Sequence, residues 1–127
     1  MEEGIVPGGG IALLRARHVL TRMEGANLDE TSGIQLVLRA LEAPLRCIVA
    51  NAGDEASVVL NRVDAANEPS FGYNAATRTF GDLLQWGIID PAKVTRLALQ
   101  NAVSIAALIL TTDCLITQAA DDGLPQP

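Results

Sequence analysis

The sequence predicts a mainly α-helical domain. Apolar residues make up 49% of the chain but aromatic residues only 3%, so the core must be built from alanine, valine, isoleucine and leucine. Over most of the chain these residues recur with the 3.6-residue period of an amphipathic helix. Capping signals, a proline and single glycines divide the periodic stretches into about five helices.

The first two helices are marked by local signals at their ends. One follows the glycine turn at residues 7–10, and its apolar stripe stops before Gly25. Asn27 can then accept a hydrogen bond at the start of the next helix, and Glu30, three residues later, completes a capping box. We therefore expect a second helix to start directly after Asn27.

Pro44 interrupts the apolar stripe that continues from this second helix to Ala52. A proline inside a helix removes one hydrogen bond and clashes with the preceding turn, so a kink or break is expected near Ala43. Gly53 stops the following helix, and Asp54 is expected to cap a short one that reaches about Val63.

The rest of the chain mixes irregular and helical signals. Residues 64–70 suggest a surface loop, residues 71–73 a short extended segment, and residues 83–86 a short helix closed by Gly87. Asp90 and Pro91 suit the N-cap and first turn of a helix that reaches about residue 110. After Ala102 this helix is apolar on every face, which indicates burial in a larger body. The β-branched residues at 111–117 predict a final strand.

The composition excludes several classes of partner. Nine Lys and Arg against fifteen Asp and Glu give a net charge of −6 over 127 residues, the length of one domain. A polyanion-binding surface needs clustered positive charge, so nucleic acid is not expected as a partner.

No targeting or membrane segment is predicted either. Glu2 and Glu3 occupy the place of the basic region of a signal peptide, and the longest apolar run, residues 102–110, is shorter than the about 20 residues of a membrane span. We expect a cytoplasmic protein with no membrane partner.

The cysteines and the histidine give no sign of a metal or catalytic site. Cys47 and Cys114 are far apart, neither belongs to a CxxC motif, and His18 is the single histidine. Two free, buried thiols in a reducing cytosol are expected. We expect His18 to lie on the surface beside Arg15 and Arg22.

Two features admit both a structural and a binding interpretation. Backbone N–H groups of the glycine turn at the start of a helix can bind an anion, although the chain lacks the Gly-Lys-Ser/Thr ending of a Walker-type loop. The same turn can instead let two helices pack closely. Asp90 likewise suits either an N-cap or a fixed anionic acceptor.

Three segments together resemble the closing third of a group I, GroEL-like chaperonin: Pro7-Gly8-Gly9-Gly10, Tyr73-Asn74-Ala75-Ala76-Thr77 and Ile89-Asp90-Pro91. The resemblance runs almost without gaps from Glu2 to about Thr117. It implies a helical bundle equivalent to the C-terminal half of a chaperonin equatorial domain, with a short C-terminal strand. The partial equatorial domain would occupy residues 1–117, and a polar tail residues 118–127.

The resemblance also implies ATP as cofactor. In the family, the glycine matching Gly9 lies against the nucleotide, and the residues matching Asn74, Ala75 and Ala76 lie beside the adenine. The aspartate matching Asp90 accepts hydrogen bonds from the ribose hydroxyls. All five positions therefore serve the base and the sugar.

The family's phosphate-binding, magnesium-binding and catalytic segments have no match in this sequence. It contains no Gly-Asp-Gly-Thr-Thr and no Thr-Leu-Gly-Pro motif. Phosphoryl transfer depends on positioning and charge neutralisation at the phosphates. We therefore expect no catalytic residue, no metal ligand and no ATPase activity from this chain by itself. The apical domain, through which the family binds unfolded proteins, also has no match.

The resemblance implies other chaperonin subunits as partners. Arg46 and Glu55 match positions at the contact between two stacked rings, although for the isolated chain an ordinary pair of solvated charges is the favoured interpretation. The expected function is that of a fragment of an ATP-dependent chaperonin, carrying the base and ribose half of the ATP site. The alternative is a non-catalytic assembly or interaction module that docks on chaperonin subunits.

Overall fold

The computed structural model describes residues 3–66, 68–114 and 116. The chain divides into two compact units, Met1–Arg96 and Leu97–Pro127. The first unit contains four complete helices and two small antiparallel sheets, which confirms the mainly α-helical class. The second unit contains the greater part of one long helix.

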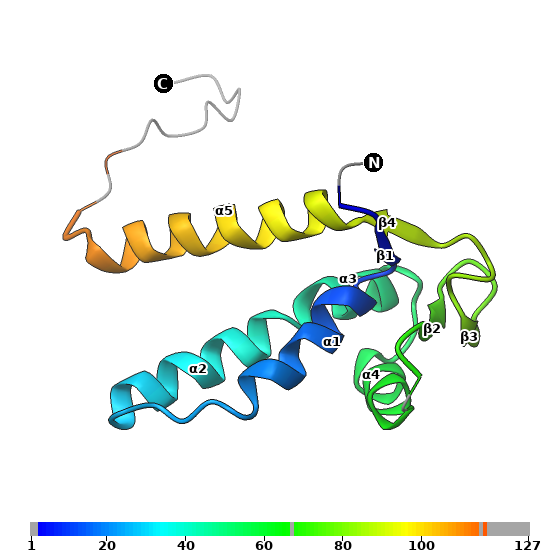
Figure 1. The fold of residues 1–127 in the computed structure, drawn as a ribbon, viewed down its shortest axis with the longest axis horizontal. Coiled ribbons are helices and arrows are strands. Elements are labelled where there is room, and N and C mark those ends of the chain that lie inside the picture. The colour runs from blue at the N-terminus through cyan, green and yellow to red at the C-terminus, as the bar shows by residue number, and fades with distance from the viewer. Residues whose placement is uncertain (1–2, 67, 115, 117–127) are drawn as a thin grey trace, which may run out of the picture. The chain divides into compact units, whose positions relative to one another are not determined.

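Five helices and four strands follow one another along the described residues (Figure 1). In chain order they are β1 (Ile5–Pro7), α1 (Ile11–Leu20), α2 (Leu28–Ala40), α3 (Ala43–Asn51), α4 (Ala56–Ala65), β2 (Phe71–Asn74), β3 (Thr79–Asp82), β4 (Ile89–Pro91) and α5 (Ala92–Thr111). Strand β1 pairs with β4, and β2 forms a hairpin with β3.

The predicted capping box of α2 is confirmed. The Glu30 N–H donates to Asn27 Oδ1 at 2.8 Å, and the Glu30 carboxylate accepts the Ala26 N–H at 2.7 Å. The first bond satisfies an N–H group that the helix itself leaves without a partner, and the second ties the Glu30 carboxylate to the residue before the N-cap.

The predicted break at Pro44 is also confirmed. Helix α2 ends at Ala40 and α3 begins at Ala43, which places Pro44 in the first turn of α3. A proline is tolerated there because the N–H group that it lacks would have no partner within the helix.

The cap of α4 is Glu55, so the prediction that Asp54 caps this helix is wrong. The Glu55 carboxylate accepts the Ser57 hydroxyl at 2.6 Å and the Ser57 N–H at 3.2 Å. These hydrogen bonds lower the pKa of Glu55. The Asp54 side chain contacts Tyr73 and Arg78 of the β2–β3 hairpin instead.

The short helix predicted at residues 83–86 is a turn. Asp82 Oδ1 accepts the N–H groups of Leu84 and Gln85 at 2.9 and 3.2 Å. An Asp side chain that binds the backbone two residues on favours a turn over a helix. Asp90 lies in β4, and α5 begins at Ala92, one residue after the predicted proline start.

The strand predicted over residues 111–117 is not formed in the part that the structure describes there. Helix α5 continues through Thr111, and residues 112–114 and 116 are irregular. The Thr111 and Thr112 hydroxyls donate to the carbonyls of Ala107 and Ile109, both at 3.0 Å. A strand needs a pairing edge, whereas these hydroxyls bind the helix that precedes them. Leu115, Thr117 and the predicted tail at 118–127 lie outside the described residues.

The hydrophobic core of the first unit is formed by α1, α3, α4, β2 and the turn after β3. Its buried members are Ile11, Leu14, Leu45, Val49, Val59, Leu60, Val63, Tyr73 and Leu83. Helix α2 lies beside α1 (Figure 1), but none of its thirteen residues, all described, is buried. The segments that contribute side chains to the core, including β2, are therefore held by more buried contacts than α2 is.

Two arginines of α1 connect it to distant segments. The Arg15 guanidinium donates to the carbonyls of Val63, Glu68 and Phe71 at 3.1, 2.9 and 3.4 Å, so it binds both ends of the connection between α4 and β2. Arg17 forms ion pairs with Glu42 and Asp64.

Every residue of α5 is either exposed or partly buried. This helix has 20 residues, and an 18-residue stretch of it has a mean hydropathy of 1.5, so among the described helices it is long enough and apolar enough to cross a membrane. A single helix of this kind is weak evidence for a membrane span, because a core helix of a larger soluble protein can have the same length and composition.

Candidate functional site

The glycine turn lies directly beside the segment that carries Asp90. In the β1–β4 ladder, Val6 is opposite Asp90 and Pro7 is opposite Ile89. The pairing continues past the strand, since the Gly8 N–H donates to the Ile88 carbonyl at 2.9 Å. Residues 80 or more positions apart are therefore joined by backbone hydrogen bonds.

The same turn also lies against the β2–β3 hairpin. A Cβ atom at Gly9 would stand 3.8 Å from the carbonyl oxygen of Tyr73, the residue before Asn74. The structure thus brings Gly9 together with the segments that carry Asn74 and Asp90, all within the first unit.

The turn also permits close packing of two helices. Gly9 and Gly10 have φ angles of +63° and +80°, which favour glycine. A Cβ atom at Gly10 would lie 2.7 Å from the Leu45 amide nitrogen, closer than a side chain can approach. The packing interpretation therefore holds at Gly10, where α1 meets α3, and leaves Gly9 as the turn residue that faces the hairpin.

Asn74 shapes the turn between β2 and β3 with its own side chain. Its Oδ1 atom accepts the N–H groups of Ala76 and Thr77 at 3.0 and 3.4 Å. Because the amide oxygen is committed to the turn, the Nδ2 group is the part that can donate to a ligand. Ala75 packs against the core and Ala76 is exposed, and both side chains are small enough for a planar ring to approach.

Asp90 is partly buried, and its backbone is fixed by the ladder with Val6. Its carboxylate is held two residues before α5, whose N-terminus carries partial positive charge. An ionised carboxylate only accepts hydrogen bonds, so it suits hydroxyl groups as partners.

The hairpin is anchored by contacts that sequence reasoning missed. The Tyr73 hydroxyl donates to the Asp54 carboxylate. Arg78 donates to the Ala52 carbonyl at 2.8 Å, and its Nε lies 3.6 Å from the same carboxylate. The hydrogen bond to Asp54, followed by burial, raises the pKa of Tyr73 above its ordinary value of 10.0. A buried tyrosine needs a partner for its hydroxyl, so Tyr73 itself is the residue in the sequence that points to such a contact.

The two predicted ring-contact residues both have partners within the chain. Arg46 forms an ion pair with Glu42 four residues earlier, at 2.8 Å, and Glu55 caps α4. Both side chains are exposed. Their contact with another ring stays a prediction.

The cysteines are free, and both are exposed, so the expectation of buried thiols is wrong. Cys47 lies in α3 between Leu45 and Val49, which face the core, and this spacing turns Cys47 outward. His18 is half exposed, as expected of a surface histidine, with Nε2 3.5 Å from Asp64 Oδ1.

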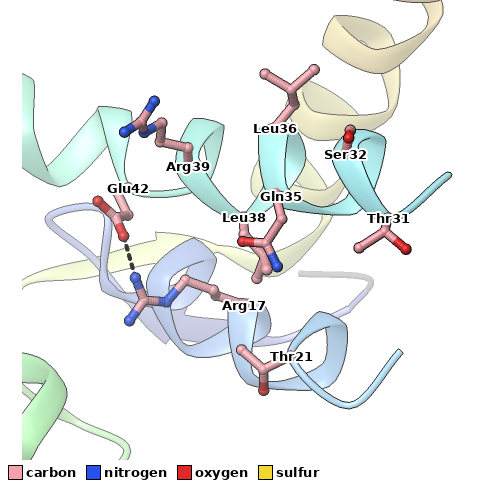
Figure 2. Close-up of a pocket in the computed structure, with 9 residues that line it drawn as sticks. All are labelled: Arg17, Thr21, Thr31, Ser32, Gln35, Leu36, Leu38, Arg39 and Glu42. Carbon is pink, nitrogen blue, oxygen red and sulfur yellow. Dashed lines mark hydrogen bonds and ion pairs between the residues drawn. The ribbon is translucent and has the colours of Figure 1, made fainter. Parts of the chain in front are cut away.

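A groove of about 710 Å³ between α1 and α2 contains none of the predicted site residues (Figure 2). It is lined by Arg17, Thr21, Thr31, Ser32, Gln35, Leu36, Leu38, Arg39 and Glu42. The ion pair of Arg17 with Glu42 crosses one end of it. Within the described ranges no group of three or more His, Cys, Asp or Glu side chains is arranged to hold a metal. The candidate site is the place where the glycine turn meets the segments that carry Asn74 and Asp90.

Comparison with known proteins identifies the family. A model of the TCP-1/cpn60 chaperonin family matches residues 1–120. Chaperonin GroEL 2 of Albidiferax ferrireducens and chaperonin GroEL 1 of Polaromonas naphthalenivorans are each 74% identical to this chain over 119 residues. These alignments cover 94% of this chain but 22% of each relative, so the chain spans about a fifth of their length. With the fold mainly α-helical and the family model covering nearly all of its residues, the chain belongs to the TCP-1/cpn60 chaperonin family.

Proposed function

We propose that this chain forms the base and ribose side of an ATP site in a chaperonin subunit, and so serves ATP-dependent protein folding in the cytoplasm. The observation that carries the proposal is the convergence of the glycine turn with the segments of Asn74 and Asp90. The relatives of this chain are chaperonins over the whole matched region.

The chemistry of the converging groups suits a nucleoside. The Asn74 amide group can donate to an acceptor atom of the base, while the methyl groups of Ala75 and Ala76 allow the ring to approach. The Asp90 carboxylate can accept hydrogen bonds from ribose hydroxyls. A hydrogen bond to a charged group contributes about 1.5–3 kcal/mol.

We propose further that the chain alone binds nucleotide weakly and does not hydrolyse it. The described site offers groups for base and sugar, whereas hydrolysis depends on groups placed at the phosphates and magnesium. Adenosine and ATP should therefore bind with similar affinity.

Calorimetric titration of the purified chain with adenosine, 2′-deoxyadenosine and ATP tests the proposal. Asp90→Ala should weaken adenosine binding about 10- to 150-fold, as expected for loss of a charged hydrogen bond, and should abolish the preference for adenosine over its deoxy form. Asp113→Ala, at an exposed carboxylate that is not among the predicted site residues, is the matched control. Equal binding of the two nucleosides by the unmodified chain would contradict the ribose assignment. Magnesium-dependent turnover that Asp90→Ala abolishes would contradict the non-catalytic assignment.

The exposed apolar residues of α5 favour a second candidate function, an assembly module that docks on chaperonin subunits. Arg46 and Glu55, both exposed, would then contribute to a contact between rings. Mixing the chain with a full-length chaperonin and measuring sedimentation separates the two candidates. Binding that is indifferent to Asp90→Ala but lost in Arg46→Ala favours the module.

A further inference from the structure

We propose that Asp54 is a positioning residue for nucleotide binding, because it holds the β2–β3 hairpin, through Tyr73 and Arg78, where Asn74 can meet the base. The inference rests on the proposed function, since it concerns the same site. It assigns a role to the Asp54 carboxylate, which is not one of the groups proposed to contact the base or the ribose.

The two partners of Asp54 bracket the turn that carries Asn74. Tyr73 immediately precedes Asn74, and its hydroxyl donates to the Asp54 carboxylate. Arg78 ends the turn, with Nε 3.6 Å from the same carboxylate oxygen and Nη2 donating to the Ala52 carbonyl at 2.8 Å. The turn is thus held at both of its ends by the short connection between α3 and α4.

That connection is itself well fixed. The Gly53 N–H donates to the Ala50 carbonyl at 2.9 Å, and the Asp54 N–H donates to the Val49 carbonyl at 3.1 Å. Val49 is fully buried. The Asp54 carboxylate therefore projects from backbone that the core holds in place.

The anchoring contacts are separable from the packing of the hairpin. Tyr73 is 5% exposed, and its ring lies 4.9 Å from that of Phe80 between ring centroids. The β2–β3 ladder joins Phe71 to Asp82 and Asn74 to Thr79 without any contribution from Asp54. Removing the hydroxyl or the carboxylate should leave strand pairing and ring packing intact and release only the turn. The effect should therefore fall on ligand binding more than on unfolding.

The single tyrosine of the chain allows the anchor to be measured directly. Ultraviolet absorbance of the phenolate reports Tyr73 alone, whose pKa is raised above 10.0 chiefly by its hydrogen bond to Asp54. This contribution to folding is fully present below pH 10.0 and is lost as the pH rises through the raised pKa. In Asp54→Ala the titration should move down towards the ordinary value. Glu24→Gln, at an exposed carboxylate, should leave it unchanged.

Nucleoside binding then tests the positioning role, using adenosine, 2′-deoxyadenosine and guanosine as probes. Tyr73→Phe and Asp54→Ala should each weaken adenosine binding about three- to tenfold, the range for one lost hydrogen bond. They should also reduce the preference for adenosine over guanosine while preserving the preference for adenosine over its deoxy form, because Asp90 is untouched. A purely structural role would lower all affinities together with the urea midpoint.

The outcomes separate this inference from the proposed function. Failure of the unmodified chain to bind adenosine overturns the proposed function, and the inference with it. Adenosine binding that is normal in the unmodified chain and unchanged in both variants overturns the positioning role alone. A Tyr73 titration that Asp54→Ala does not move overturns the anchor itself. Tyr73→Phe, which keeps the buried ring, preserves the test should Asp54→Ala fold poorly.

Discussion

At the scale of single residues, Gly10 sets how closely α1 approaches α3. A Cβ atom there would lie 2.7 Å from the Leu45 nitrogen, and the backbone φ is +80°. Gly10→Ala introduces both a clash with backbone and a strained conformation, so it should lower the free energy of unfolding by about 1–3 kcal/mol. Urea unfolding followed by circular dichroism measures the change.

Gly33 offers a matched control in the same experiment. It lies inside α2, and a Cβ atom there would meet no atom within 4 Å. Gly33→Ala should leave stability unchanged or raise it by up to about 1 kcal/mol, because alanine favours the helix. Equal losses in the two variants would contradict the close approach at Gly10.

The two thiols supply a second prediction at this scale. Cys47 and Cys114 are both free and exposed. Both should react with a thiol reagent in native buffer as fast as an unhindered thiol, and Cys47→Ser should remove half of the signal. If the thiols react only after urea is added, they are buried, as the sequence predicts, and the exposure seen in the structure is contradicted.

At the scale of secondary structure, the features predictable from sequence are those made by residues within a few positions of one another. Asn27 and Glu30 form the capping box of α2, and Pro44 separates α2 from α3. The apolar residues after Asp82 resemble a helical stripe and so predict a helix, but the segment is a turn because the Asp82 carboxylate binds the N–H groups of Leu84 and Gln85.

The candidate site was predictable only in part, because its assembly depends on long-range contacts. The resemblance to chaperonins identifies Gly9, Asn74 and Asp90 as separate nucleotide-binding positions but does not show how they come together. Their convergence depends on the β1–β4 ladder and on the docking of the hairpin, which leave no periodic pattern in the sequence. The pairing of Asp54 with Tyr73 was missed for the same reason.

Helix α2 depends on its cap more than the other helices of the first unit do, since none of its described residues is buried. Asn27→Ala removes the acceptor for the Glu30 N–H and should cost about 0.5–2 kcal/mol. Amide hydrogen exchange should show the loss of protection concentrated in α2. Ser32→Ala removes only an exposed hydroxyl that binds back to Leu28, and should be neutral. Loss of protection spread evenly over the first unit would contradict this local role.

At the scale of the whole molecule, the apolar surface of α5 dominates the expected solution behaviour. Ile105, Leu108 and Ile109 are 58–61% exposed and Leu110 is 85% exposed. Apolar area left in water costs about 25 cal/mol per Å², so a few hundred Å² amounts to several kcal/mol. We expect the purified chain to self-associate or to bind an apolar dye.

A double variant tests this expectation. Ile105→Gln combined with Ile109→Gln should lower dye binding and the sedimentation coefficient. Leu28→Gln, which changes a residue of α2 that is 86% exposed, should alter neither. A monomer that binds no dye and unfolds cooperatively would contradict the expectation that the apolar surface of α5 requires a partner.

The three carbonyl groups that Arg15 gathers have a consequence for how the chain can vary in length. Val63 lies in the last turn of α4, Glu68 lies in the connection between α4 and β2, and Phe71 is the first residue of β2. Because one side chain closes this connection at its base, added residues would bulge outward without moving either helix or strand. A Gly-Ser pair inserted after Ala66 should therefore leave the urea midpoint nearly unchanged. The same insertion combined with Arg15→Ala should not be tolerated, which makes this connection a place for labels or fused domains only while the arginine remains.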